Sequence, residues 1–175
     1  NPSEIVDIES RLDALAKSLE GTNLTDLPPT VSFKKAQLTE VPELLSGKRI
    51  GIAKDEAFSF IYDANVQTLE AMGAVIVYFS PIHDRSIPTV DAIWFPGGYP
   101  ELYLEQLSKN SSMISALNAL QEINTPMLAE CGGMLYLQKT FTDINGDKTP
   151  MAGIFPGNGY MRPKGGCHGM QTAPL

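Results

Sequence analysis

The sequence predicts an α/β fold built on a doubly wound, mostly parallel β-sheet. Four short apolar runs have the composition of buried strands, at residues 49–53, 75–79, 92–95 and 126–130. Helical patterns separate these runs along the chain. Strands that alternate with helices at this spacing pair in parallel and carry helices on both faces of the sheet. We therefore expect a flavodoxin-like architecture.

Two longer segments between the strands show helical periodicity. Residues 64–73 place apolar side chains on one face before Gly73 ends the helix, and residues 112–123 show a similar face. Shorter helices are expected at about residues 102–107 and at 132–139. The inward positions of the two longer helices are Val66, Leu69 and Met72 in the first, and Ile114, Leu117 and Leu120 in the second.

The first 47 residues differ from the rest of the chain. A stripe of apolar residues, three or four positions apart, predicts an amphipathic helix that ends at Gly21. The stripe consists of Ile5, Ile8, Leu12, Leu15 and Leu19. The stretch that follows contains two adjacent prolines and no sustained period, which indicates a linker. The helix either packs on its own domain or is the tail of a preceding one, and residues 48–175 are expected to form the globular domain.

The last part of the chain is expected to turn once, to form one more strand and then to lose its order. Asn145-Gly146 is a strong turn signal, and residues 151–155 favour a strand. Beyond Pro156 the sequence contains five glycines and no periodicity. The fold is therefore expected to be incomplete at the C-terminus, with a poorly ordered tail.

Composition and charge argue against several classes of protein. Hydrophobic residues make up 43% of the chain and charged residues 19%, which is typical of a globular protein. A net charge of −7 without a cluster of Lys or Arg argues against binding to nucleic acid or to a membrane surface. No apolar stretch is long enough to cross a bilayer, so we expect a cytoplasmic protein. Two cysteines and two histidines are too few for a disulfide framework or a metal site.

The sharpest chemical signal is the sequence Glu130-Cys131-Gly132-Gly133, where a strand is expected to turn into a helix. A residue at such a turn has its side chain exposed above the sheet, as in the nucleophile elbow of serine hydrolases. The helix N-terminus favours a thiolate there, and the N–H of Gly132 can stabilise an oxyanion. The plainer alternative is a buried structural cysteine. The elbow and the paired glycines favour the nucleophile.

A second glycine pair follows the strand at residues 92–95. Ligands of open α/β sheets gather at the carboxyl ends of the strands. Gly97 and Gly98 are therefore expected to offer free N–H groups to a second side of the same oxyanion hole. By itself this pair would indicate only a glycine-rich turn.

A general base for the thiol is not evident. His83 lies in the loop after the second strand, where a solvated polar role is favoured. His168 lies in the glycine-rich tail with no strand to hold it, so it is an improbable partner of Cys131.

The residues from about Arg49 to Pro156 closely resemble the carboxyl-terminal glutaminase half of cobyrinic acid a,c-diamide synthases. The specific motifs are GGYPE at residues 97–101 and AECGGMLYL at residues 129–137. These synthases are class I glutamine amidotransferases of the cobalamin pathway. The resemblance therefore implies the flavodoxin-like fold of that class.

The resemblance also implies a reaction and a set of partners. Cys131 matches the nucleophile that hydrolyses glutamine through a thioester, and Gly98 and Gly132 match the oxyanion-hole region. The family's amino-terminal half is a P-loop-type ATPase that uses ATP and magnesium to activate the a and c carboxylates of cobyrinate for attack by ammonia. The expected partners are glutamine and, through that half, cobyrinate, with a homodimer as one assembly state. The glutaminase domain itself is expected to need no cofactor or metal.

The sequence departs from the family pattern in two respects, and these departures leave two alternative functions open. No G-x-x-x-x-G-K-[ST] motif occurs, so the synthetase half is absent and residues 1–47 resemble the connection between the halves. The family's catalytic histidine lies beyond the point where this chain stops, and we interpret the last ten or so residues as a frameshifted continuation. Weak or no activity is expected from the chain alone. The alternatives are a thiol hydrolase of the intracellular-protease superfamily and a non-catalytic remnant that binds a synthetase partner through the apolar stripe of the first helix.

Overall fold

A computed structural model describes residues 6–26, 28–34 and 40–163. The chain divides into two compact units, residues 1–39 and 40–175. In the first unit, helix α1 spans Ile8–Leu19 and a short 3-10 helix, η2, spans Asn23–Thr25. No residue of α1 is buried. The amphipathic helix predicted from the apolar stripe is confirmed from Ile8 onward, and Ile5 lies outside the described residues.

The second unit holds the sheet and the remaining helices. In chain order its elements are β1 (Arg49–Ala53), α2 (Asp63–Ala71), β2 (Val75–Phe79), β3 (Ala92–Phe95), η3 (Pro100–Leu102), α3 (Leu104–Lys109), α4 (Ser111–Glu122), β4 (Met127–Ala129), α5 (Gly132–Leu137), β5 (Thr140–Thr142), β6 (Lys148–Pro150) and β7 (Asn158–Tyr160). None of the helices in the described ranges combines the length and the apolar character that a bilayer crossing needs.

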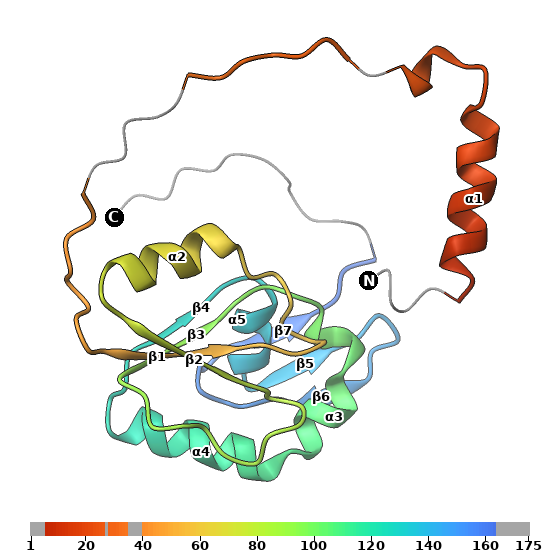
Figure 1. Cartoon of the computed structure of the whole chain (residues 1–175). Helices are drawn as coiled ribbons and strands as arrows, with labels where there is room; N and C mark the ends of the chain where they lie inside the picture. Colours follow the sequence, from red (N-terminus) through yellow and green to blue (C-terminus); the bar gives the residue numbers. More distant parts are fainter. Residues whose placement is uncertain (1–5, 27, 35–39, 164–175) are drawn as a thin grey trace, which may run out of the picture. The chain divides into compact units, whose positions relative to one another are not determined.

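Four strands form the main sheet in the order β2-β1-β3-β4, and every neighbouring pair is parallel. The first three strands match their predicted residues, and β4 is shorter than predicted at both ends. Helix α2 lies on one face of the sheet, and α3, α4 and α5 lie on the other (Figure 1). The predicted flavodoxin-like, doubly wound α/β fold is confirmed.

Side-chain alternation divides the core into two clusters, one on each face of the main sheet. The larger cluster joins Ile93 and Phe95 of β3 to buried side chains of α3, α4 and α5. The smaller cluster joins Ile50, Ile52 and Trp94 to the partly buried apolar side of α2. Both faces are apolar because a parallel sheet is covered on both sides.

The expected domain boundary at residue 48 falls inside the second unit. The segment before β1 already bonds to the turn after α2. The N–H of Leu45 donates to the carbonyl of Met72 at 2.8 Å, and the N–H of Gly47 donates to that of Gly73 at 3.0 Å. The second unit accordingly begins at Glu40.

The prediction of a strand at residues 151–155 is wrong. The N–H groups of Met151, Ala152 and Phe155 donate to Lys139, Tyr136 and Leu137, so this segment bonds to the end of α5 and not to a strand. Its apolar side chains fill the larger core cluster instead. An apolar run that caps a helix end and a buried strand have the same composition, which explains the error.

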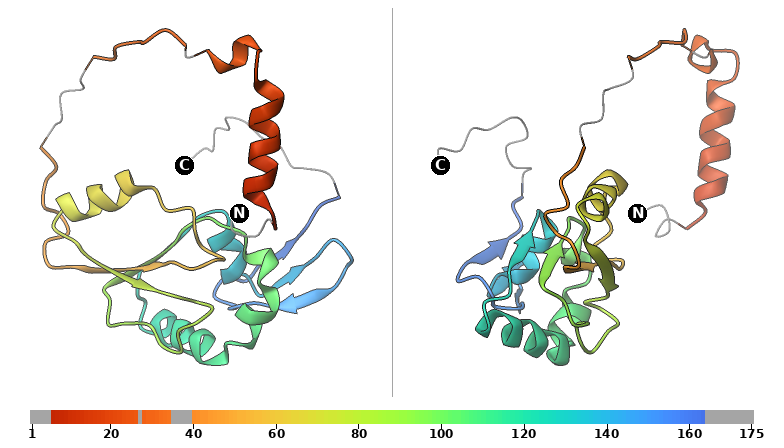
Figure 2. Two further views of the ribbon diagram at one scale, coloured as in Figure 1. Left: turned by 45° about the vertical axis from the view of Figure 1, so that its right-hand side comes forward. Right: turned by 60° about the vertical axis from the view of Figure 1, so that its left-hand side comes forward.

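A second, three-stranded sheet was not predicted. Its order is β6-β5-β7, with β5 and β6 antiparallel around the predicted Asn145-Gly146 turn and β5 parallel to β7. It lies beside α3, in blue in Figure 2. Strand β7 lies in the segment expected to be poorly ordered, so that expectation is wrong for residues 158–160. Residues 164–175, including Cys167, His168 and the proposed frameshift, lie outside the described residues.

Candidate active site

Cys131 stands between the end of β4 and the first residue of α5, in an unusual backbone conformation. Its φ is 46° and its ψ is −112°. The other two non-glycine residues with positive φ in the described ranges are Asp7 and Asn124, whose side chains tolerate it. A cysteine does not share this tolerance, and such a conformation costs on the order of 1–3 kcal/mol. The turn is therefore strained, and it carries an exposed thiol.

Backbone hydrogen bonds fix this corner to the neighbouring strand. The N–H of Glu130 donates to the carbonyl of Phe95, the last residue of β3, at 2.9 Å. Inside the turn, the N–H of Gly133 donates to the carbonyl of Glu130 at 2.8 Å, and the N–H of Met134 donates to that of Cys131 at 3.1 Å. The thiol thus stands on a turn anchored at its entry and at its exit.

The two glycines after Cys131 are required by close approach of other backbone segments. A Cβ on Gly132 would lie 2.7 Å from both the carbonyl oxygen of Gly98 and Cδ of Pro100. A Cβ on Gly133 would lie 2.4 Å from the carbonyl oxygen of Phe95. The N-terminus of α5 therefore packs directly against the loop that follows β3.

The Gly97-Gly98 loop lies between the cysteine corner and the loop after β1. The position that a Cβ on Gly97 would occupy is 3.5 Å from Cβ of Cys131. On the other side, a Cβ on Gly98 would lie 2.0 Å from the carbonyl oxygen of Ala57. All four residues expected at the site, Cys131, Gly132, Gly97 and Gly98, thus lie together at the carboxyl ends of the parallel strands.

The N–H groups of Gly98 and Gly132 donate to no acceptor in the described part of the chain. Backbone N–H groups are strong donors, and free ones beside a nucleophile suit the negative oxygen that forms when a thiolate attacks a carbonyl. The corner therefore combines an exposed thiol with two unpaired donors on adjoining loops.

A half-exposed aromatic pair lies beside the Gly97-Gly98 loop, and sequence reasoning missed it. The rings of Phe60 and Tyr99 meet edge to face, with centroids 5.1 Å apart. Phe60 also reaches Gly97, because its Cδ2 lies 3.3 Å from the position of a Cβ there. Tyr99 belongs to the GGYPE motif. Phe60 lies in a separate aromatic stretch, and nothing in the sequence of that stretch indicates a contact with Tyr99.

Asp55 holds the loop that carries Phe60. Its Oδ1 accepts the N–H of Ala57 at 2.9 Å, and its Oδ2 accepts the hydroxyl of Ser80 at 2.8 Å and the N–H of Ile82 at 2.9 Å. The carboxylate thus ties the loop after β1 to the loop after β2. Because Ala57 packs on Gly98, this tie also supports the candidate oxyanion loop.

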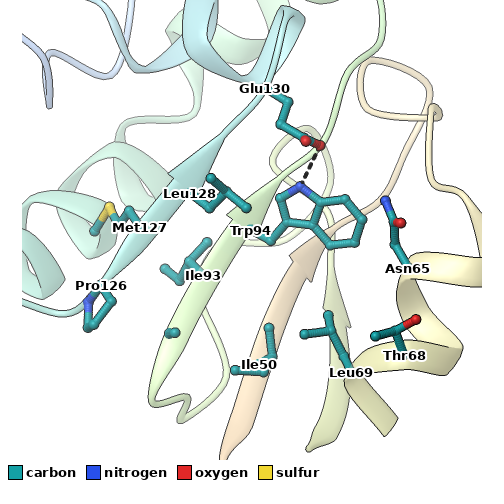
Figure 3. Close-up of a pocket in the computed structure, with 11 residues that line it drawn as sticks. Ile50, Asn65, Thr68, Leu69, Ile93, Trp94, Pro126, Met127, Leu128 and Glu130 are labelled. Atoms are coloured by element: carbon teal, nitrogen blue, oxygen red, sulfur yellow. Dashed lines mark hydrogen bonds between the residues drawn. The ribbon is translucent and has the colours of Figure 1, made fainter. Parts of the chain in front are cut away.

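A groove of about 460 Å³ opens on the α2 face of the sheet, next to the edge strand β4. Figure 3 shows Leu69 and Asn65 of α2 on one side and Leu128 on the other. At its upper end, the indole Nε1 of Trp94 donates to Oε2 of Glu130 at 2.9 Å. The carboxylate next to Cys131 in the chain is thus bound on the groove side.

The histidines do not complete a dyad in the described structure. His83 is the one histidine within the described residues, and its Nε2 lies 2.9 Å from Oε2 of Glu56 in the loop after β1. The pKa of Glu56 lies below its ordinary value, first because of a backbone hydrogen bond and then because of His83. His83 therefore joins two loops through an exposed contact with the carboxylate of Glu56. Within the described ranges there is also no cluster of three or more His, Cys, Asp or Glu that suits a metal ion.

Comparison with known proteins gives a consistent result. Residues 49–169 match the model of the CobB/CobQ-like glutamine amidotransferase domain. The chain is 42% identical over 172 residues to hydrogenobyrinate a,c-diamide synthase of Stutzerimonas stutzeri, covering 98% of this chain and 40% of that protein. It is 44% identical over 116 residues to cobyrinate a,c-diamide synthase of Salmonella typhimurium, covering 66% of this chain and 25% of that protein.

A solved structure is also similar. A protein described as a peptidase E, from Listeria monocytogenes EGD-e, matches with a TM-score of 0.49 and 13% identity over 67% of both chains.

Proposed function

Because the chain belongs to the CobB/CobQ-like glutamine amidotransferase domain family, we propose that Cys131 attacks the side-chain amide carbon of glutamine. The thiolate forms a C–S bond, the C–N bond breaks, and the nitrogen leaves as ammonia after taking up a proton. Water then cleaves the thioester, which gives glutamate and restores the thiol. Each step passes through a negative oxygen that the N–H groups of Gly98 and Gly132 stabilise.

The observation that carries this proposal is the strained cysteine corner beside a second glycine loop. A buried structural cysteine has no need of φ 46°, of exposure, or of two neighbouring backbones with free N–H groups. A nucleophile elbow needs all three. The geometry therefore supports acyl transfer at Cys131 over a structural role.

The rest of the reaction belongs to a larger protein. The chain spans 40% of the first relative's length and 25% of the second's. We propose that ammonia from this domain amidates the a and c carboxylates of cobyrinate or hydrogenobyrinate in a separate synthetase half. In this proposal that half, and not this domain, binds ATP and Mg²⁺, and residues 1–47 belong to the connection. The sequence contains no P-loop motif of its own.

The proposal is tested by labelling with the diazo-ketone analogue of glutamine. This reagent carries a reactive diazomethyl carbon in place of the amide nitrogen of glutamine, next to the carbonyl carbon that matches the amide carbon. We expect one adduct per chain, located on Cys131 by peptide mass spectrometry and prevented by excess glutamine. The matched control is Cys167→Ser, which should be labelled as fast as the wild type, whereas Cys131→Ser should not be labelled.

Turnover is measured separately, as ammonia released from glutamine. We expect slow or no turnover from this chain alone, because no histidine of the described residues forms a dyad with the thiol of Cys131. Efficient hydrolysis that Cys131→Ser abolishes would contradict this expectation and still support the nucleophile.

A chain that keeps its circular-dichroism spectrum but gains no adduct would contradict the proposed site. That result would favour the second reading, a non-catalytic module that binds a synthetase partner. The observation behind this reading is the apolar stripe of α1, in which Leu12 and Leu15 are 56% and 57% exposed.

A further inference from the structure

The aromatic pair of Phe60 and Tyr99 lies beside Gly97, in the loop that adjoins Cys131. Phe60 and Tyr99 are 44% and 43% exposed, so both rings keep apolar surface open to a ligand. Cδ2 of Phe60 and Cβ of Cys131 lie 3.3 Å and 3.5 Å from one shared point, the position of a Cβ on Gly97. Because Gly97 has no side chain, the ring of Phe60 and Cβ of Cys131 both border the space that a Cβ would fill.

We propose that Phe60 and Tyr99 form the apolar wall that binds the methylene chain of the substrate. This inference rests on the proposed glutaminase reaction and names the residues that select its substrate. When the amide carbon of glutamine is at Cys131 and its oxygen faces Gly98 and Gly132, the two methylene groups must extend past one side of the turn. The side at Gly97 carries the exposed apolar surface of Phe60 and Tyr99.

The wall is held in place before any substrate binds. The N–H of Phe60 donates to the carbonyl of Gly97 at 3.1 Å, so the ring's own backbone is bonded to the glycine loop. Asp55 fixes the start of the same loop through Ala57. The edge-to-face contact with Tyr99 also supports the ring of Phe60. A binding wall that is already ordered loses little entropy when the ligand arrives.

The chain offers a matched control close to the pair. Tyr62 belongs to the same loop and precedes α2, yet it is 72% exposed and makes no ring contact with the aromatic residues of the described structure. Replacing Tyr62 removes a similar ring from the same segment without touching Gly97.

The test compares two reagents by their rates of labelling at Cys131. The diazo-ketone analogue of glutamine carries the methylene chain, whereas iodoacetamide does not. For Phe60→Ala we expect the concentration of the analogue that gives the half-maximal labelling rate to rise about tenfold. A change of this size corresponds to the binding free energy of about two buried methylene groups. The rate with iodoacetamide should stay within about twofold. Tyr99→Ala should show a smaller rise with the analogue, and Tyr62→Ala none.

Phe60→Leu keeps an apolar side chain and guards against a misfolded alanine variant. It should recover most of the affinity for the analogue, and all variants should melt within a few degrees of the wild type. Equal affinity for the analogue in the wild type and in both Phe60 variants would overturn this inference alone. An equal loss with both reagents would also overturn it, because the ring would then only support the turn. Failure of the wild type to react with the analogue, while it reacts with iodoacetamide, would overturn the proposed function and this inference with it.

Discussion

The two faces of the main sheet differ in how completely they are covered. On the face of α3, α4 and α5, side chains such as Phe95, Leu107 and Leu117 are fully buried in one continuous cluster. On the other face, α2 covers the side of β1, and the groove beside it leaves Leu128 58% exposed. The sequence of β4 is apolar on both faces, so composition alone does not distinguish them.

The difference shows where stability and chemistry reside in this domain. The closed face supplies most of the buried apolar area and positions α5 against β3. The open face carries the Trp94–Glu130 hydrogen bond, one residue from the thiol. The candidate site lies at the carboxyl ends of the strands, between the two faces. Its geometry depends on the packing of α5 on the closed face, and its thiol stays exposed.

The largest expected effect comes from removing one leucine from each face. Leu117→Ala leaves a cavity in the closed cluster, and we expect it to lower the free energy of unfolding by about 2–5 kcal/mol. Leu128→Ala removes a side chain that already meets water, so we expect a loss below about 1 kcal/mol. Urea unfolding of both variants measures the contrast. Equal losses would show that the groove face is covered in solution.

The sequence predicted the elements of the main sheet well because their signals are local. Three strands were located to the residue, since each is a short apolar run bounded by turn residues. Cys131 and the glycines of both loops were found for a similar reason. The carboxyl ends of parallel strands meet at one edge, so residues that follow two neighbouring strands come together whatever the details of packing.

The small sheet and the aromatic wall were beyond such reasoning. Strands of three residues carry almost no periodicity. The N–H groups of residues 151–155 bond to carbonyls at the end of α5 and not to a neighbouring strand. The contact of Phe60 with Gly97 joins residues far apart in the chain through an isolated β-bridge. Long-range pairs of this kind are fixed by tertiary packing, which a sequence pattern with period two or 3.6 does not report.

The second prediction uses the pH dependence of the closed face. Tyr136 is fully buried between Phe58 and Phe95, and its hydroxyl has no hydrogen-bond partner in the described structure. Burial raises the pKa of Tyr136 above its ordinary value, and the charge of Asp55 adds to the rise. The folded state therefore keeps a proton that the unfolded chain releases above about pH 10. Stability from this group is fully present below that pH and is lost as the pH rises further.

Tyr136→Phe removes this dependence. At pH 8 we expect the variant to match the wild type within about 1 kcal/mol, because the lost hydroxyl makes no hydrogen bond. At pH 11 the wild type should have lost about 1 kcal/mol more than the variant, since the other tyrosines are common to both. Urea unfolding at the two values measures the difference. Parallel losses would mean that the hydroxyl reaches water, and that the closed face is less closed than the structure shows.

The smallest effect on stability is expected at Cys131, at the carboxyl ends of the strands. The sign of the change in the free energy of unfolding is what tests the proposed strain. Cys131→Gly relieves a conformation that costs on the order of 1–3 kcal/mol, against the 0.5–1 kcal/mol that glycine's greater freedom in the unfolded chain costs. We expect a net gain of about 1 kcal/mol in the free energy of unfolding, while the labelling of the thiol is lost. Cys131→Ala keeps the strain and removes the thiol, so it should leave stability near the wild-type value. Asn124→Gly provides the control at a tolerated positive φ of 58° and should change little. If Cys131→Gly were no more stable than Cys131→Ala, the corner would store no strain, and the thiol's exposure would follow from the length of the turn alone.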